Sequence, residues 1–186
     1  MSIKVHLGCW HRFIPGFVHV DLCDMPHIDH KSSIDKLPFF ADDSVDLIYC
    51  SHALEYFDRE QAHTVLKEWW RVLVPGGLLR LAVPDFNALI EVYMQTGELT
   101  KVLGPLYGKM SITSPEGPAT LYHKTTYDEH SLAKLLVELG FIEPQRWDWR
   151  ETEHAHIDDH SQAYFPHMQK DTGLLVSLNM QARKSN

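Results

Sequence analysis

Histidine is the residue type that most directly suggests chemistry in this sequence. The chain holds 13 histidines among 186 residues, and a neutral imidazole is well matched to accept a proton near neutral pH. Transfer of a group onto an amine or a hydroxyl requires such a base. The catalytic candidates are His52, which follows an apolar run, and His123, which closes a segment rich in glycine and proline.

A second group of candidate residues stands at the ends of short apolar runs in the first half of the chain. In a parallel α/β sheet, ligands bind outside the carboxyl ends of the strands. A carboxylate at the end of a second strand can accept hydrogen bonds from both hydroxyls of a ribose, so Asp21 is the ribose candidate. The other residues at such ends are Gly8, Cys9, Trp10, Ser33, Ile34, Asp35, Ser51, His52 and Glu55.

The segment TEHAHIDDHSQAYFPHM contains a third cluster. His154, His156, Asp158 and His160 are residue types that bind Zn²⁺ or Mn²⁺ when the chain brings them together. The same composition suits a solvated polar loop, or a loop that binds a hydroxylated substrate. The spacing leaves these three interpretations open.

Hydrophobic periodicity predicts the elements that must position these residues. Strands are expected at Ile3–Leu7, Phe17–Asp21, Asp46–Ser51, Leu78–Val83, Phe141–Trp149 and Leu174–Ala182. Asp58 and Gln61 form a capping box for a helix that ends before Pro75, and Asp85 and Asp128 cap two further helices. Two segments lack clear periodicity: residues 95–124, a candidate lid or insert, and the polar stretch 150–173.

The alternation of strands and helices predicts an α/β fold. We expect one domain over residues 1–186, with a mostly parallel sheet and helices on both faces. About nine residues, Gly8 to Gly16, join the first two strands. A parallel crossover usually takes a dozen residues or more, so the first crossover helix must be reduced or missing.

Composition narrows the functional classes. Net charge is −8 with no basic run, which disfavours nucleic acid as a partner. No stretch is long and apolar enough to span or target a membrane. The three cysteines are odd in number and form no Cys-x-x-Cys pair, which indicates reduced thiols in a cytoplasmic protein.

The runs VHLGCW, LPFFADDSVDLIYCSHALEYF, EWWRVLVPGGLLRLAVPDF and LLVELGF, with Asp21 between the first two, resemble class I S-adenosylmethionine-dependent methyltransferases. Among them the chain is most similar to the small type 11 methyltransferase-like proteins. The resemblance implies a Rossmann-like sheet of the seven-stranded type with a final antiparallel strand, and S-adenosylmethionine as cofactor. It places Leu7, Gly8, Cys9 and Trp10 in the first cofactor loop, Asp21 at the ribose, Ser33, Ile34 and Asp35 at the adenine, and Ser51, His52 and Glu55 at the methionine side.

Two positions depart from the family pattern. Trp10 stands where the family has the second glycine of Gly-x-Gly, so its indole either obstructs the cofactor or presents a π-face to the sulfonium or the adenine. Ser33 stands where the family has an adenine-binding aspartate, and the acid comes two residues later as Asp35.

The resemblance implies methyl transfer to a small polar acceptor, with an oxygen or nitrogen of a sugar-like molecule as the expected nucleophile. Two alternatives belong to other classes. One is a binding or scaffold protein that kept the fold without catalysis. The other is a metal-binding protein or hydrolase built on the His154–His160 cluster.

Overall fold

The computed structural model describes residues 2–114 and 117–186. Its centre is a seven-stranded sheet in the order β3-β2-β1-β4-β5-β11-β8. In the described part of the chain six of these strands run parallel, and β11 is antiparallel to both neighbours. The strands are β1 (Lys4–Leu7), β2 (Val18–Asp21), β3 (His30–Lys31), β4 (Val45–Ser51), β5 (Leu73–Pro84), β8 (Phe141–Arg146) and β11 (Ser177–Lys184).

This sheet confirms the expected α/β class with a mostly parallel sheet and an antiparallel last strand. The chain leaves β1 toward β2 on one side, and β4 pairs with β1 on the other side. The strand order therefore reverses at β1 and β4. Ligands of open α/β sheets bind in the crevice at such a reversal.

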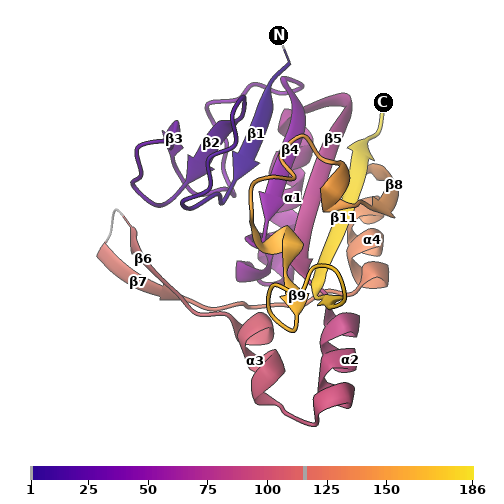
Figure 1. Ribbon diagram of the computed structural model, residues 1–186. Helices are drawn as coiled ribbons and strands as arrows, with labels where there is room; N and C mark the ends of the chain where they lie inside the picture. The colour runs from indigo at the N-terminus through magenta and orange to yellow at the C-terminus, as the bar shows by residue number, and fades with distance from the viewer. Residues whose placement is uncertain (1, 115–116) are drawn as a thin grey trace.

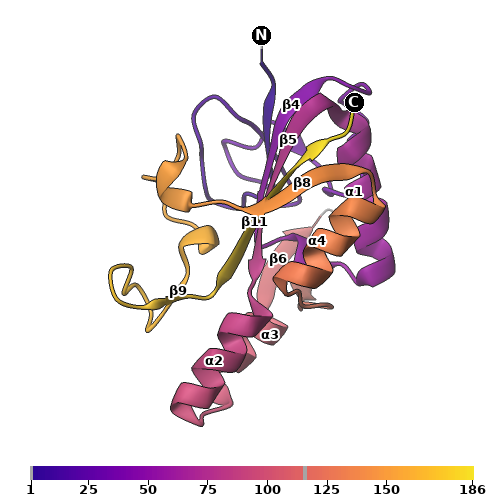
Figure 2. The ribbon, with the colours of Figure 1, turned by 90° about the vertical axis from the view of Figure 1, so that its right-hand side faces the viewer.

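The α-helices that pack on the sheet, α1 (Arg59–Val72) and α4 (Glu129–Glu138), lie on the same face (Figure 2). The capping box predicted from Asp58 and Gln61 starts α1. Trp69 of α1 is fully buried, and its indole N–H donates to the Ile34 carbonyl at 2.7 Å. This bond ties the loop between β3 and β4 to the helical layer.

The opposite face is covered differently. As expected, no helix forms between β1 and β2 in the described residues; instead Ile14 and Phe17 of this short loop pack against Tyr49 and Trp147. The 3₁₀ helices η2 (Trp149–Glu151) and η3 (His160–Gln162) complete the layer, so the α-helices expected on both faces are confined to one. The crossover is too short for a helix, and the polar segment 150–173 covers the gap.

Residues 95–124 are more regular than their sequence indicates. They contain α3 (Thr100–Tyr107) and a hairpin of β6 (Met110–Ser114) and β7 (Gly117–Leu121). Gly104 and Pro105 inside α3 disfavour helix locally, which is why the pattern predicted none. Packing against α2 (Phe86–Thr96) compensates, because Leu89 and Val92 form a cluster with Val102. Figure 1 shows α2, α3 and the hairpin projecting from the carboxyl end of the parallel strands.

Some predicted boundaries were wrong. β5 begins at Leu73, so it includes the turn residues Pro75 to Gly77, which a register shift in its pairing with β4 accommodates. The predicted last strand divides: β10 (Leu174–Leu175) pairs with β9 (Tyr164–Phe165) in a separate ribbon, and β11 starts at Ser177. The short 3₁₀ helix η1 (Leu54–Tyr56) follows β4. Across the described residues, no helix has the length and apolar character needed to cross a bilayer.

Candidate functional site

A cavity of about 460 Å³ opens at the carboxyl ends of β1, β2 and β4. Its size falls within the range of small-molecule sites. The loops after these strands supply one wall, and α3 with the β6–β7 hairpin supplies another. Of the predicted site residues, those that line it are Gly8, Cys9, Trp10, Asp21, Ser33, Ile34, Ser51, His52, His123 and His160.

Gly8 makes the first turn of the cavity wall. Its φ is +63°, in the left-handed region, and a Cβ built on it would lie 2.6 Å from the Ala53 Cβ. Its backbone N–H donates to the Val20 carbonyl at 2.9 Å. Glycine is therefore required here both by conformation and by the close approach of the loop after β4.

Asp21 lies at the end of β2, only 7% exposed, and lines the cavity. Its two oxygens accept backbone hydrogen bonds from Trp10 at 2.8 Å and from Cys23 at 2.7 Å. An ionised carboxylate offers about four lone-pair sites, so each oxygen retains one for a ligand hydroxyl. Asp21 thus fixes the first loop and still fits a ribose.

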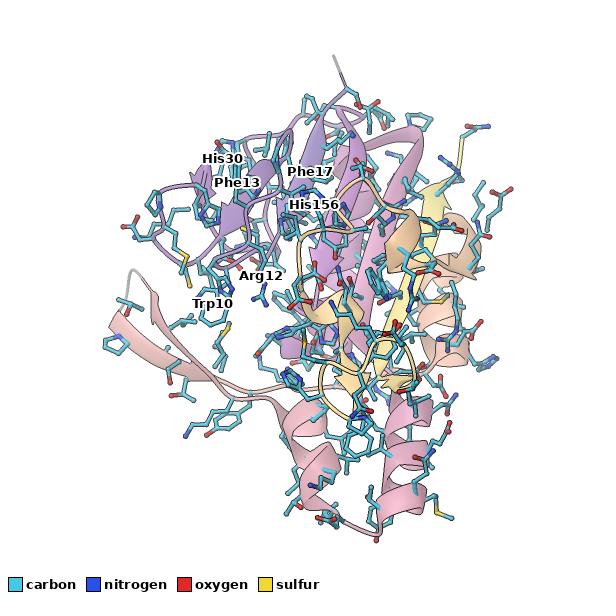
Figure 3. The ribbon with its side chains drawn as sticks, viewed as in Figure 1. Trp10, Arg12, Phe13, Phe17, His30 and His156 are labelled. Carbon is cyan, nitrogen blue, oxygen red and sulfur yellow. The ribbon has the colours of Figure 1, made fainter. Side chains whose placement is uncertain are left out.

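Trp10 adopts φ +44°, the conformation that the family's glycine takes without strain. The side chain is 39% exposed and lines the cavity together with Met110 and Ile112 of the hairpin. Figure 3 shows the ring extending from the sheet end toward that hairpin. The indole therefore lies on the cavity wall, where its contact with a ligand can be tested.

Only some of the residues expected at the adenine line the cavity. Ser33 and Ile34 line it, and Ile34 is buried. Asp35 is half-buried and Leu7 is buried in the hydrophobic core; neither side chain is among the lining groups. Their assignment to the cofactor stays a prediction.

The cavity thiols are protonated at neutral pH. Burial, and next the Asp21 charge, raise the pKa of Cys9 to about 12 and that of Cys23 to about 11. Thiolate is the nucleophilic form of cysteine. These residues therefore contribute apolar surface rather than a nucleophile to the cavity.

His52, Glu55 and His123 converge behind the opposite wall. The Glu55 carboxylate is fully buried; its Oε1 lies 3.2 Å from His52 Nδ1 and 3.8 Å from His123 Nε2. His52 adopts φ +54°, and its Nε2 lies 2.9 Å from Ser177 Oγ. His123 Nδ1 lies 2.9 Å from the Pro105 carbonyl oxygen of α3. The two predicted catalytic histidines thus share one buried carboxylate, which itself does not line the cavity.

The His154–His160 cluster is dispersed. His154 is buried and its ring contacts Tyr49 at a centroid distance of 4.4 Å, Asp158 pairs with Lys170, and His160 lines the cavity. The His154 ring also contacts that of Phe17 at a centroid distance of 5.9 Å, and in the view of Figure 3 the label of His156 stands apart from those of Trp10 and Arg12. Within residues 2–114 and 117–186, no group of three or more His, Cys, Asp or Glu side chains can hold a metal ion. Turns separate the residues that an extended segment would have brought together.

Several lining residues escape sequence reasoning. Arg12 and Asp159 enter through the loops on the second face, and Met110, Ile112 and Leu121 enter through the hairpin. Nothing in the local pattern brings the hairpin over the strand ends. His6 also lines the cavity, and only its alternation with Val5 and Leu7 on a short strand could have indicated that it faces away from the helical layer.

Comparison with known proteins supports the description of the fold. A family model described as a methyltransferase domain, of type 11, matches residues 17–81, about a third of the chain. The match covers Asp21, Ser33 and the segment Ser51 to Glu55, but not the first loop or His123. A search of curated proteins found no match.

Solved structures with a similar fold cover the whole chain. One is a possible histamine N-methyltransferase from Thermotoga maritima, with a TM-score of 0.60 at 13% identity and 83% of its own length covered. Another is 1,6-didemethyltoxoflavin-N1-methyltransferase from Burkholderia thailandensis, solved with S-adenosylhomocysteine, with a TM-score of 0.57, 15% identity and 72% coverage. A third is a putative methyltransferase from Listeria monocytogenes, at 0.57, 16% and 92%.

These findings confirm the resemblance: the chain has the Rossmann-like fold of class I S-adenosylmethionine-dependent methyltransferases. The family match and the neighbours support S-adenosylmethionine as the cofactor. The residues present fit it, because Gly8 allows the close turn and Asp21 keeps free lone pairs at the cavity wall.

Proposed function

We propose that this protein transfers a methyl group from S-adenosylmethionine to a small polar acceptor, with an oxygen or nitrogen nucleophile of a sugar-like molecule as the expected substrate. The observation that carries the proposal is the cradle at the ends of β1, β2 and β4, where Gly8 and Asp21 fix the loops around one cavity. The thiols that remain free, at Cys9, Cys23 and Cys50, favour the cytoplasm as its location.

The bound cofactor would supply a methyl carbon already activated by positive sulfur. This chain's residues then have to align that carbon with the acceptor and exclude water. Asp21 would hold the ribose hydroxyls, Ser33 and Ile34 the adenine, and Gly8, Cys9 and Ser51 the methionine part. Desolvation of the cavity strengthens each of these polar contacts.

The acceptor would enter between the loop after β4 and the insert of α3 and the hairpin. This part of the wall mixes apolar groups, such as Ile112 and Leu121, with imidazoles and the Asp159 carboxylate. Such a mixture suits a small ligand with several polar groups. The catalytic assignment of His52 and His123 stays a prediction.

Calorimetric titration with S-adenosylmethionine tests the proposal. We expect binding by the wild type and an affinity at least about tenfold lower for Asp21→Asn, because the amide keeps one acceptor oxygen where the carboxylate has two. Asp24→Asn is the matched control, since Asp24 is exposed and pairs only with Lys31 at the surface. Absence of binding by the wild type at millimolar ligand would favour the scaffold alternative.

A further inference from the structure

Four histidines line the cavity: His6, His52, His123 and His160. An imidazole can take a proton from an acceptor only through a ring nitrogen that carries a free lone pair and is open to the cavity. The hydrogen bonds of the described residues determine which of the four meets this condition.

His52 does not meet it. The Asn179 amide donates from Nδ2 to the Ser161 carbonyl at 2.9 Å, so its Oδ1 accepts from Ser177 Oγ, also at 2.9 Å. The Ser177 hydroxyl proton is thus committed, and its oxygen accepts from His52 Nε2. In this arrangement Nε2 carries a hydrogen. The other ring nitrogen of His52, Nδ1, faces Glu55.

His52 Nδ1 lies 3.2 Å from the Oε1 atom of Glu55 in a fully buried site. Neither oxygen of that carboxylate accepts a regular hydrogen bond within the described chain. Both ring nitrogens of His52 are therefore directed at protein groups rather than at a ligand.

His123 lines the cavity, but both of its ring nitrogens are directed at protein groups. Its Nδ1 can only donate to the Pro105 carbonyl, and its Nε2 points to Glu55. The Gly108 backbone packs against the ring so closely that a Cβ there would lie 2.3 Å from Nε2. His123 thus links Glu55 to α3.

His6 is enclosed. It is 2% exposed, and its ring contacts those of His19 and Tyr49 at centroid distances of 5.6 and 5.1 Å. Its Nδ1 is buried without a hydrogen-bond partner among the described residues. This nitrogen is closed to an acceptor, and with only 2% of the residue exposed the whole ring is far less accessible than that of His160, which is exposed.

His160 differs from the other three. Its side chain makes no hydrogen bond within the described chain, and the residue is exposed at the cavity. Its ring stands edge to face with that of His52, at a centroid distance of 5.3 Å. Enclosure by the cavity wall, and then the charges of His52 and Arg12, lower the pKa of His160 to about 4, although Asp159 and Glu55 act in the opposite direction.

We propose that His160 accepts the proton of the nucleophile that receives the methyl group, and that His52 and Glu55, which face each other at 3.2 Å, are positioning residues. The inference rests on the proposed function. The acceptor heteroatom would bond to the methyl carbon as the carbon–sulfur bond breaks, leaving its electron pair on sulfur. The proton of the heteroatom would pass to the free nitrogen of His160 and from there to solvent.

The test uses diethyl pyrocarbonate, an electrophile that acylates neutral, accessible imidazole nitrogens, with mass spectrometric mapping of each histidine in the full chain. At pH 7 we expect His160 to react at least about tenfold faster than His6, His52 or His123. Between pH 7 and 5.5 its rate should stay constant, because His160 remains neutral, whereas free N-acetylhistidine should slow by about tenfold. Faster labelling of His52, His123 or His6, or a tenfold slowing of His160, would overturn the proposal.

A calorimetric titration of the same preparation tests the proposed function separately from the role of His160. If the unlabelled protein does not bind S-adenosylmethionine, the proposed function itself is wrong. In His160→Gln, cofactor affinity should stay within about threefold of the wild type, because His160 lies on the acceptor side. A loss of more than about tenfold would make His160 a cofactor residue and contradict its assignment.

Discussion

The two sides of the cavity are built in different ways. The cofactor side is formed by tight loops directly after β1 and β2, and backbone hydrogen bonds to Asp21 hold them. The proposed acceptor side is formed by side chains from distant parts of the chain, His52, His123 and His160, with Glu55 and Ser177 behind them. Local chain geometry therefore defines where the cofactor fits, whereas tertiary packing defines the proton chemistry beside it.

The largest expected effect is on the cofactor side. Gly8→Ala places a Cβ 2.6 Å from that of Ala53 at φ +63°, so we expect a loss of about 2–4 kcal/mol in the free energy of unfolding and at least a hundredfold loss of cofactor affinity. Gly16→Ala is the control: its φ is +83°, but nothing lies within 4 Å. Urea denaturation and calorimetry compare them, and equal losses would show that strain alone matters at Gly8.

On the acceptor side, the next effect concerns the buried carboxylate of Glu55 and the stability of the protein. Glu55→Ala removes the buried group that faces His52 and His123 and creates a cavity, which should cost about 2–4 kcal/mol of stability. Glu55→Gln should cost less than about 1.5 kcal/mol, because its amide group has the same shape and can hydrogen-bond to both imidazoles. Chemical denaturation measures both variants. A Gln variant as unstable as the Ala variant would contradict the assignment of Glu55 as the group that orients the two imidazoles.

The smallest expected effect concerns Trp10. Trp10→Gly relieves the left-handed backbone but removes the indole from the wall, so S-adenosylmethionine should bind about tenfold more weakly if the ring faces the sulfonium. S-adenosylhomocysteine, which lacks the positive charge, should change by less than threefold. Tighter binding of both ligands would identify the indole as an obstruction, which would favour the scaffold alternative.

Most of the residues that the sequence predicts at the cofactor line one cavity, because each of the signals is local; their contact with the cofactor stays a prediction. The end of an apolar run, a glycine in a turn and a carboxylate after the second strand lie within a few residues of one another, as in Gly8 and Asp21. The missing crossover helix follows from a count of residues between two strands. The capping box of α1 depends on Asp58 and Gln61 alone.

The sequence failed where long-range packing decides. Residues 95–124 lack periodicity, yet contact with α2 makes α3 helical and brings the hairpin over the strand ends. The cluster from His154 to His160 looks contiguous, but turns send His154 into the second face and His160 into the cavity.

By itself, the sequence determined the α/β class, the missing crossover and the position of the loops proposed to hold the cofactor, because periodicity and turn chemistry act over a few residues. The tertiary structure decided which imidazole keeps a nitrogen open to the cavity. That property depends on the groups that face the other imidazoles: the Ser177 hydroxyl, the Pro105 carbonyl and the Glu55 carboxylate. Ser177 is far from His52 in sequence, and the fold alone orients the other two. The partners of a histidine's ring nitrogens are set by its neighbours in space, and the sequence alone does not show which residues those are.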